Sequence, residues 1–176
     1  MANTPQTETQ SVLDHGESVW RFTQRILSRD FDGMRIPQSL IDNFDEVTSN
    51  LHSYEIIQDY NILHDCGKPY CIEYDEDGRK HFPNHAHVSK ETYLNLNESK
   101  REVADLIGWD MLLHSGTADE IKEVGLSKYD AHTLLITSLS EIHSNASMFG
   151  GIESISFKSK WKKLDRRSKM ILRGDY

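Results

Sequence analysis

The chain is poor in cysteine and proline and has no long hydrophobic run. Its 176 residues include two Cys and four Pro. Two cysteines, Cys66 and Cys71, are too few for a disulfide framework, so we expect a reducing, cytoplasmic environment. No apolar stretch approaches the ~20 residues of a membrane span, and residues 1–10 lack the basic and apolar regions of a secretory signal. These features argue against a disulfide-rich secreted protein and against a membrane protein.

Acidic residues dominate, but the charge is unevenly spread. The chain has 20 Lys+Arg against 28 Asp+Glu, a net charge of −8. Eight of the basic residues lie in residues 158–176, which contain two acidic ones. The simpler interpretation is a solvated helix that neutralises an acidic body; a weak nucleic-acid contact is the alternative. We expect a flexible N-terminus over residues 1–10, one domain over 11–157, and a basic segment over 158–176 that packs on or extends from it.

Hydrophobic periodicity predicts a mostly α-helical fold with one short β-hairpin. Between residues 70 and 82 the pattern changes, and Asp77-Gly78 is typical of a hairpin turn. Pro37 is placed to open a helix, and Gly67 with Pro69 beyond it to stop one. The other helices are predicted from apolar spacing. They cover residues 11–28, 49–64, 85–96, 100–114, 119–124 and 130–148.

The nine histidines suggest where chemistry takes place. His64-Asp65 follows an apolar helix, and neighbouring side chains on a helix point about 100° apart. A metal ion near the helix end is one target that both side chains can reach. Mixed imidazole and carboxylate ligands are typical of a divalent site that activates water rather than of a closed structural zinc site.

The segment around this pair resembles a known superfamily. Residues 63–69, Leu-His-Asp-Cys-Gly-Lys-Pro, are followed by an acidic hairpin and by the histidine-bearing segment of residues 81–89. This arrangement resembles the HD-domain metal-dependent phosphohydrolases, and most of all the HD domains of bacterial tRNA nucleotidyltransferases. The resemblance covers roughly residues 13–145 and implies an HD-like helical bundle. It is most specific between residues 63 and 89.

The resemblance also implies a set of site residues. His15, His64 and Asp65 match the first three metal ligands, and His85 and His114 match histidines that hold a second ion. The family usually supplies an Asp from its last helix; here Glu141 occupies that register, with Asp130 as the other candidate. Lys68 matches a lysine that contacts phosphate. The implied cofactor is one or two divalent ions of unknown identity (Mn, Ni, Co, Fe, Zn or Mg).

Three functions remain open at this stage. The first is hydrolysis, by metal-activated water, of a nucleotide or RNA-end phosphate, with a 2′,3′-cyclic or terminal phosphate as first guess. Asp65 and Lys68 would be catalytic, and Arg79 and Lys80 could hold a second phosphate if the hairpin folds over the site. The second is hydrolysis of a nucleoside triphosphate or cyclic (oligo)nucleotide at the same site. The third is a nucleic-acid-binding module with a degraded metal site, which the Glu at position 141 would favour.

Overall fold

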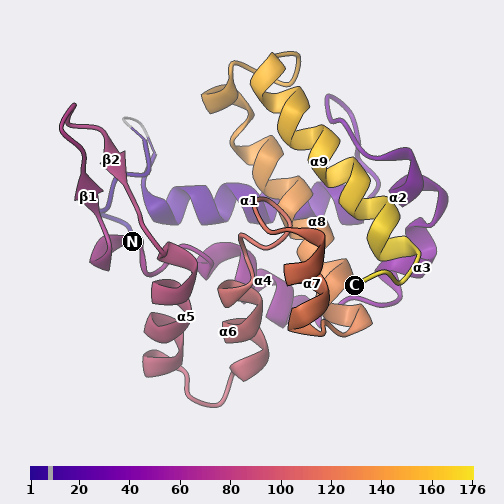
Figure 1. Ribbon diagram of the computed structural model, residues 1–176, viewed down its shortest axis with the longest axis horizontal. Coiled ribbons are helices and arrows are strands. Elements are labelled where there is room, and N and C mark those ends of the chain that lie inside the picture. The colour runs from indigo at the N-terminus through magenta and orange to yellow at the C-terminus, as the bar shows by residue number, and fades with distance from the viewer. Residues whose placement is uncertain (8–9) are drawn as a thin grey trace. The chain divides into compact units, whose positions relative to one another are not determined.

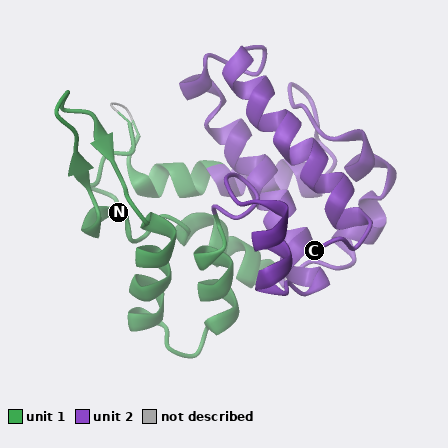
Figure 2. Ribbon diagram, viewed as in Figure 1, with its two compact units in different colours: residues 1–18, 54–110 green, residues 19–53, 111–176 purple. Residues whose placement is uncertain are grey.

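The helices divide into two compact units. The computed structural model describes residues 1–7 and 10–176. Unit 1 comprises residues 1–18 and 54–110, and unit 2 comprises residues 19–53 and 111–176 (Figure 2). The predicted mostly α-helical fold with one short hairpin is confirmed. The flexible N-terminus predicted over residues 1–10 includes residues 8–9, which lie outside the described residues.

Unit 1 is built from helices and the hairpin. Its core contains Tyr60, Tyr93 and Leu106, each at most 2% exposed. Helices α5 and α6 lie side by side (Figure 1), and α4 packs against α6. The hairpin pairs Glu73 with His81 in antiparallel register. The elements of this unit are the start of α1 (Val12–Leu27), α4 (Tyr54–Leu63), the 3₁₀ turn η1 (Lys68–Tyr70), β1 (Glu73–Tyr74), β2 (Lys80–His81), α5 (His85–Leu96) and α6 (Arg101–Gly108).

Unit 2 is organised around one buried helix. This is α8, which begins with a capping box in which the Ser127 side chain accepts from the Asp130 amide and the Asp130 carboxylate accepts from the Ser127 amide. Most of α8 is buried, and it packs against α9, which also contacts α2. Besides the rest of α1, the unit contains α2 (Gln38–Asp42), α3 (Phe44–Thr48), α7 (Ala118–Val124), α8 (Lys128–Ser144), the 3₁₀ turn η2 (Ala146–Phe149) and α9 (Ile155–Leu172).

Three predicted helices are too long. The one predicted over residues 130–148 ends at Ser144, and the 3₁₀ turn η2 follows it. The helix predicted over residues 49–64 begins at Tyr54. His52 lies outside it because its amide donates to Thr133 Oγ1 at 3.2 Å and its ring contacts Asp130 Oδ1 at 2.8 Å. The helix predicted over residues 100–114 ends at Gly108, and residues 109–115 form turns. A nearby long-range bond, from the Tyr60 hydroxyl to Asp110 at 2.8 Å, holds the chain just after that helix end.

The basic C-terminal segment is mostly helical. Helix α9 spans most of residues 158–176 and begins three residues before them. Its Trp161 indole N–H donates to the Arg35 carbonyl at 2.8 Å, so this aromatic ring is used in packing within unit 2. Lys169 pairs with Asp165 at 2.7 Å. None of the helices in the described ranges combines the length and apolarity that crossing a bilayer requires.

A buried histidine makes the stability of unit 2 depend on pH. His143 Nδ1 donates to the Leu139 carbonyl at 2.7 Å, and its Nε2 accepts from the Arg35 amide at 2.9 Å. Burial lowers the pKa of His143 below its ordinary value of 6.5, and the Leu139 carbonyl offsets part of this effect. The folded form therefore resists protonation, so stability is complete above pH ~6.5 and is lost as the pH falls below it.

We expect His143→Gln to reduce this acid sensitivity. A difference of one bound proton between the folded and unfolded states changes stability by about 1.4 kcal/mol per pH unit. Urea unfolding at pH 7.5 and 5.5 should therefore show a smaller loss for His143→Gln than for wild type, by about 1 kcal/mol. The exposed His87→Gln should behave as wild type does. Equal losses for His143→Gln and wild type would contradict the expectation.

Candidate metal centre

Four of the predicted site residues surround one buried carboxylate in unit 1. Asp65 is 1% exposed. Its Oδ2 lies 3.3 Å from His64 Nε2 and 3.7 Å from His15 Nε2, and accepts from Lys68 Nζ at 2.6 Å. Its Oδ1 lies 3.7 Å from His85 Nε2. Residues separated by up to 70 positions in the sequence thus meet at one carboxylate group.

Local structure explains how these side chains meet. His15 lies in the first turn of α1, and His64-Asp65 directly follows the end of α4. Lys68 is the first residue of η1, and His85 is the first residue of α5. The site is therefore assembled from helix ends, where side chains project past the helix and approach a common point.

Two glycines allow the elements to come this close. A Cβ atom on Gly16, next to His15, would lie 2.2 Å from the Ile62 carbonyl oxygen at the end of α4. A Cβ atom on Gly67 would lie 2.3 Å from the Ser89 amide nitrogen in α5. Gly67 follows the end of α4 and has φ −83°, which any residue adopts, so the glycine is not needed there for a left-handed backbone. The glycine is required because α5 packs directly against the backbone there.

Backbone carbonyls orient two of the imidazoles. His64 Nδ1 lies 2.8 Å from the Asn61 carbonyl oxygen, and His85 Nδ1 lies 3.1 Å from that of Phe82. Because a carbonyl oxygen only accepts, each Nδ1 carries the proton, and the Nε2 of a neutral ring has the lone pair. A second ring nitrogen bonded to a carbonyl is the usual arrangement for metal-ligating histidine.

The charge of Asp65 is maintained despite its burial. Burial by itself raises the pKa of Asp65, but its interactions with His64, Lys68 and His15 outweigh the burial and hold that pKa well below the ordinary range. Among the described residues, Asp65 Oδ1 has no hydrogen-bond partner. An ionised, buried carboxylate oxygen that lacks a donor is costly unless a cation approaches it.

The donor set fits a divalent cation. Nitrogen and oxygen ligands bind such ions at about 2.0–2.2 Å, so two donors on one ion lie roughly 3.0–3.5 Å apart. The Nε2-to-carboxylate distances from 3.3 to 3.7 Å are close to that range. They are too long for good hydrogen bonds. Ring nitrogens of His15 and His64 also lie within 4.8 Å of each other. His15, His64 and Asp65 could therefore hold a metal ion, and His85 lies beside the second carboxylate oxygen of Asp65.

The cysteine beside the site bonds to a main-chain carbonyl. The Cys66 thiol donates to the Ser89 carbonyl at 3.3 Å, and burial raises its pKa to about 11. Burial also raises the pKa of Cys71. Because the Cys66 thiol is bonded to a main-chain carbonyl, we do not include it in the donor set.

The remaining predicted ligands lie in unit 2. His114, in the turn after α6, has its Nε2 2.7 Å from Glu141 Oε2 of α8. Asp130 instead caps α8 through Ser127 and contacts His52. Asp130 and Glu141 are 11 positions apart on this helix, or roughly 16 Å. Glu141, rather than Asp130, thus lies beside another predicted ligand. That this pair contributes to the same ions as unit 1 stays a prediction.

The two hairpin residues predicted to bind phosphate, Arg79 and Lys80, lie in different surroundings. Lys80 Nζ lies 5.4 Å from the centre of the Phe82 ring, and Lys68 Nζ lies 5.1 Å from the same centre. Arg79 is 74% exposed and pairs with Asp77 at 3.3 Å. The hairpin therefore brings Lys80 near Lys68, while the ion pair of Arg79 is formed within the turn itself.

A residue that sequence reasoning missed contacts Lys68 directly. Gln6 Oε1 accepts from Lys68 Nζ at 3.1 Å. Gln6 lies in a Thr- and Gln-rich stretch without periodicity, so no pattern in a single sequence indicates this contact. Phe82, which lies beside both lysines, was also not among the predicted site residues.

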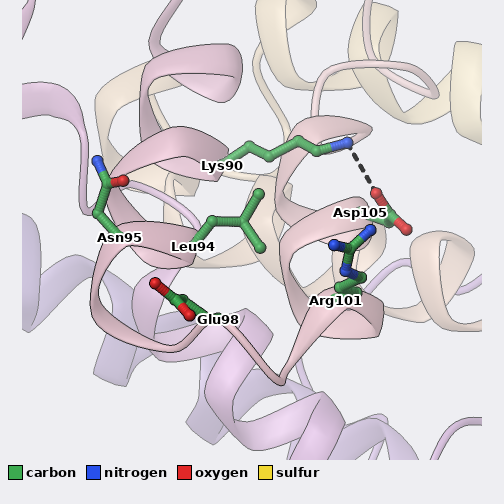
Figure 3. A pocket seen from close by; sticks show the side chains of 6 residues that line it. All are labelled: Lys90, Leu94, Asn95, Glu98, Arg101 and Asp105. Carbon is green, nitrogen blue, oxygen red and sulfur yellow. Dashed lines mark hydrogen bonds and ion pairs between the residues drawn. The ribbon is translucent and has the colours of Figure 1, made fainter.

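A cavity elsewhere in unit 1 lacks, in its described lining, the histidine and cysteine side chains that typically bind metal ions. It lies at α5, α6 and the loop between them, has a volume of about 400 Å³, and includes the ion pair between Lys90 and Asp105 at 2.7 Å (Figure 3). Its described lining contains no histidine and no cysteine. The lining residues are Lys90, Leu94, Asn95, Glu98, Arg101 and Asp105. These paired and solvated charges do not form a metal site.

Comparison of the chain with protein-family models, with curated proteins and with solved structures found no match.

Proposed function

We propose that this chain is a metal-dependent phosphohydrolase of the HD type that acts on a nucleotide or RNA-end phosphate. The observation that supports it most is the arrangement around Asp65, where three imidazoles and one ammonium group face a buried carboxylate. The order of these residues in the chain is also the order that the family resemblance predicts. Buried, charged clusters of this kind are more often retained for function than for stability.

The chain's own residues have distinct tasks in this proposal. Asp65 supplies the negative charge that attracts the cation, and His15, His64 and His85 supply neutral nitrogen ligands. A divalent ion held there would provide a water that ionises near pH 7 and positive charge beside the phosphoryl oxygens. Lys68 donates one hydrogen bond to Asp65. Its ammonium group has two further N–H donors, so it can also bind a non-bridging phosphate oxygen.

The hairpin favours a nucleotide over a simple phosphate ester. Next to the Phe82 ring, which Lys80 faces, lies a cavity of about 410 Å³ whose lining residues are Glu73, Tyr74, Asp75, His81, Phe82 and Pro83. Tyr74 is 66% exposed. Aromatic rings in a groove that also holds cations are typical of sites where a base stacks while its phosphate is bound.

A panel of substrates and metals tests the proposal. After treatment with a chelator, the protein should regain hydrolysis with Mn, Co, Ni or Mg, and 2′,3′-cyclic and terminal nucleotide phosphates should exceed p-nitrophenyl esters in kcat/KM. Turnover restricted to nucleoside triphosphates or cyclic oligonucleotides would keep the site and change the substrate. Stoichiometric metal uptake without turnover of any ester, or no uptake at all, would contradict the proposal. Absence of metal uptake and of ester hydrolysis, together with salt-sensitive RNA binding, would favour a nucleic-acid-binding module.

A further inference from the structure

The first seven residues of the chain bond to other parts of unit 1. We call residues 1–7 the N-terminal strap. The Thr4 carbonyl accepts from the Val12 amide at 2.8 Å, and Pro5 pairs with Ser11 in an isolated antiparallel bridge. The Gln6 amide donates to the Gln10 carbonyl at 2.8 Å. These bonds tie the strap to the residues at the start of α1, just before His15.

The strap supplies oxygen acceptors to both lysines near the candidate metal centre. Gln6 Oε1 accepts from Lys68 Nζ at 3.1 Å, and the Pro5 carbonyl accepts from Lys80 Nζ. Both ammonium groups also lie beside the Phe82 ring. One short segment therefore supplies hydrogen-bond acceptors to Lys68 and Lys80, the two ammonium groups that would bind a phosphate.

We propose that the N-terminal strap is an autoinhibitory element that an anionic ligand must displace. The inference rests on the proposed function, because it assigns the Gln6 and Pro5 oxygens to positions that phosphate oxygens take in the open form. The Lys68 side chain is 9% exposed with the strap in place, which leaves little access for a phosphate. A charged phosphate oxygen binds an ammonium group more strongly than a neutral amide oxygen does, so displacement is favourable once the ligand arrives.

A closed strap weakens the apparent affinity for ligand. Apparent affinity falls in proportion to the fraction of molecules that are open. Removing the Gln6 acceptor raises that fraction, whereas a carboxylate in its place adds an ion pair with Lys68 and lowers it. A residue with a purely structural role would weaken ligand binding in both variants, so the two substitutions distinguish the roles.

Binding of inorganic phosphate in Mg²⁺ buffer, measured by calorimetry, tests this directly. We expect Gln6→Ala to bind about tenfold more tightly than wild type, in line with the lower end of the range for one hydrogen bond to a charged group. Gln6→Glu should bind more weakly, with a difference that shrinks at high salt. Gln10→Ala is the matched control, because Gln10 contacts the strap through its main chain. Its affinity should equal that of wild type.

Amide exchange gives a second measurement that needs no turnover. The Gln6 and Thr7 amides both donate to the Gln10 carbonyl, so phosphate should accelerate their exchange when it releases the strap. Equal phosphate affinities of Gln6→Ala and wild type, exchange that phosphate leaves unchanged, or no phosphate binding would each overturn the inference. Hydrolysis without any of these strap effects would leave the proposed function intact. If the strap responds to phosphate as expected but no substrate is hydrolysed, the proposed hydrolase function is rejected and the inference about the strap is kept.

Discussion

Replacing Asp65 with Asn should abolish both metal binding and hydrolysis. We expect kcat/KM to fall at least ~10³-fold, because this one carboxylate faces three imidazoles and the Lys68 ammonium. Metal binding should be measured as the increase in the free energy of unfolding when the metal is added. A ligand at a hundred times its Kd stabilises the folded state by about 2.7 kcal/mol, and wild type should show such a gain with Mn or Co. Asp65→Asn should show none.

Controls separate loss of the site from loss of the fold. Breaking a buried ion pair destabilises a protein by roughly 3–5 kcal/mol, so far-ultraviolet circular dichroism of Asp65→Asn must first show native helix content. Asp105→Asn removes an equal charge from the α5–α6 cavity, where Asp105 pairs with Lys90. It should keep both activity and metal-dependent stabilisation. Wild-type activity and metal response in Asp65→Asn would refute the metal centre.

Gly67→Ala should have the largest effect on stability among the glycine substitutions we consider. The new Cβ would lie 2.3 Å from the Ser89 amide nitrogen and 2.5 Å from the Val88 carbonyl carbon, both of which are backbone atoms of α5. The contact can be relieved only if α5 moves, and α5 bears His85. We expect a loss of about 3 kcal/mol in the free energy of unfolding. Metal affinity should fall as well.

Gly108→Ala is a matched test of the same substitution. Its Cβ would lie 2.8 Å from Lys90 Cδ, which belongs to a flexible side chain that can move aside. Ala also favours helix over Gly by about 1 kcal/mol, so we expect little loss or a small gain. Urea unfolding of the two variants gives the comparison. Similar midpoints for Gly67→Ala and wild type would show that the predicted contact between residue 67 and α5 is not required.

The positions of some predicted residues could not be read from local pattern. Residues 109–114 have apolar spacing that continues a helix, yet the chain turns after Gly108 and His114 lies in that turn. Glu141 occupied the expected register in the sequence and Asp130 was the other candidate, because both are carboxylates on one apolar helix. They differ in the structure because Asp130 is bonded at the helix start, whereas Glu141 lies beside His114.

The sequence by itself determined the helical class, the hairpin at Asp77-Gly78, and which histidines to consider together. Those features depend on periodicity, turn chemistry and short motifs, all of which are local along the chain. Tertiary structure decided that Gly16 and Gly67 allow backbones to approach and that Gln6 bonds to Lys68. Such contacts join residues far apart in the chain, and their energies depend on which surfaces pack together rather than on the preferences of any residue alone.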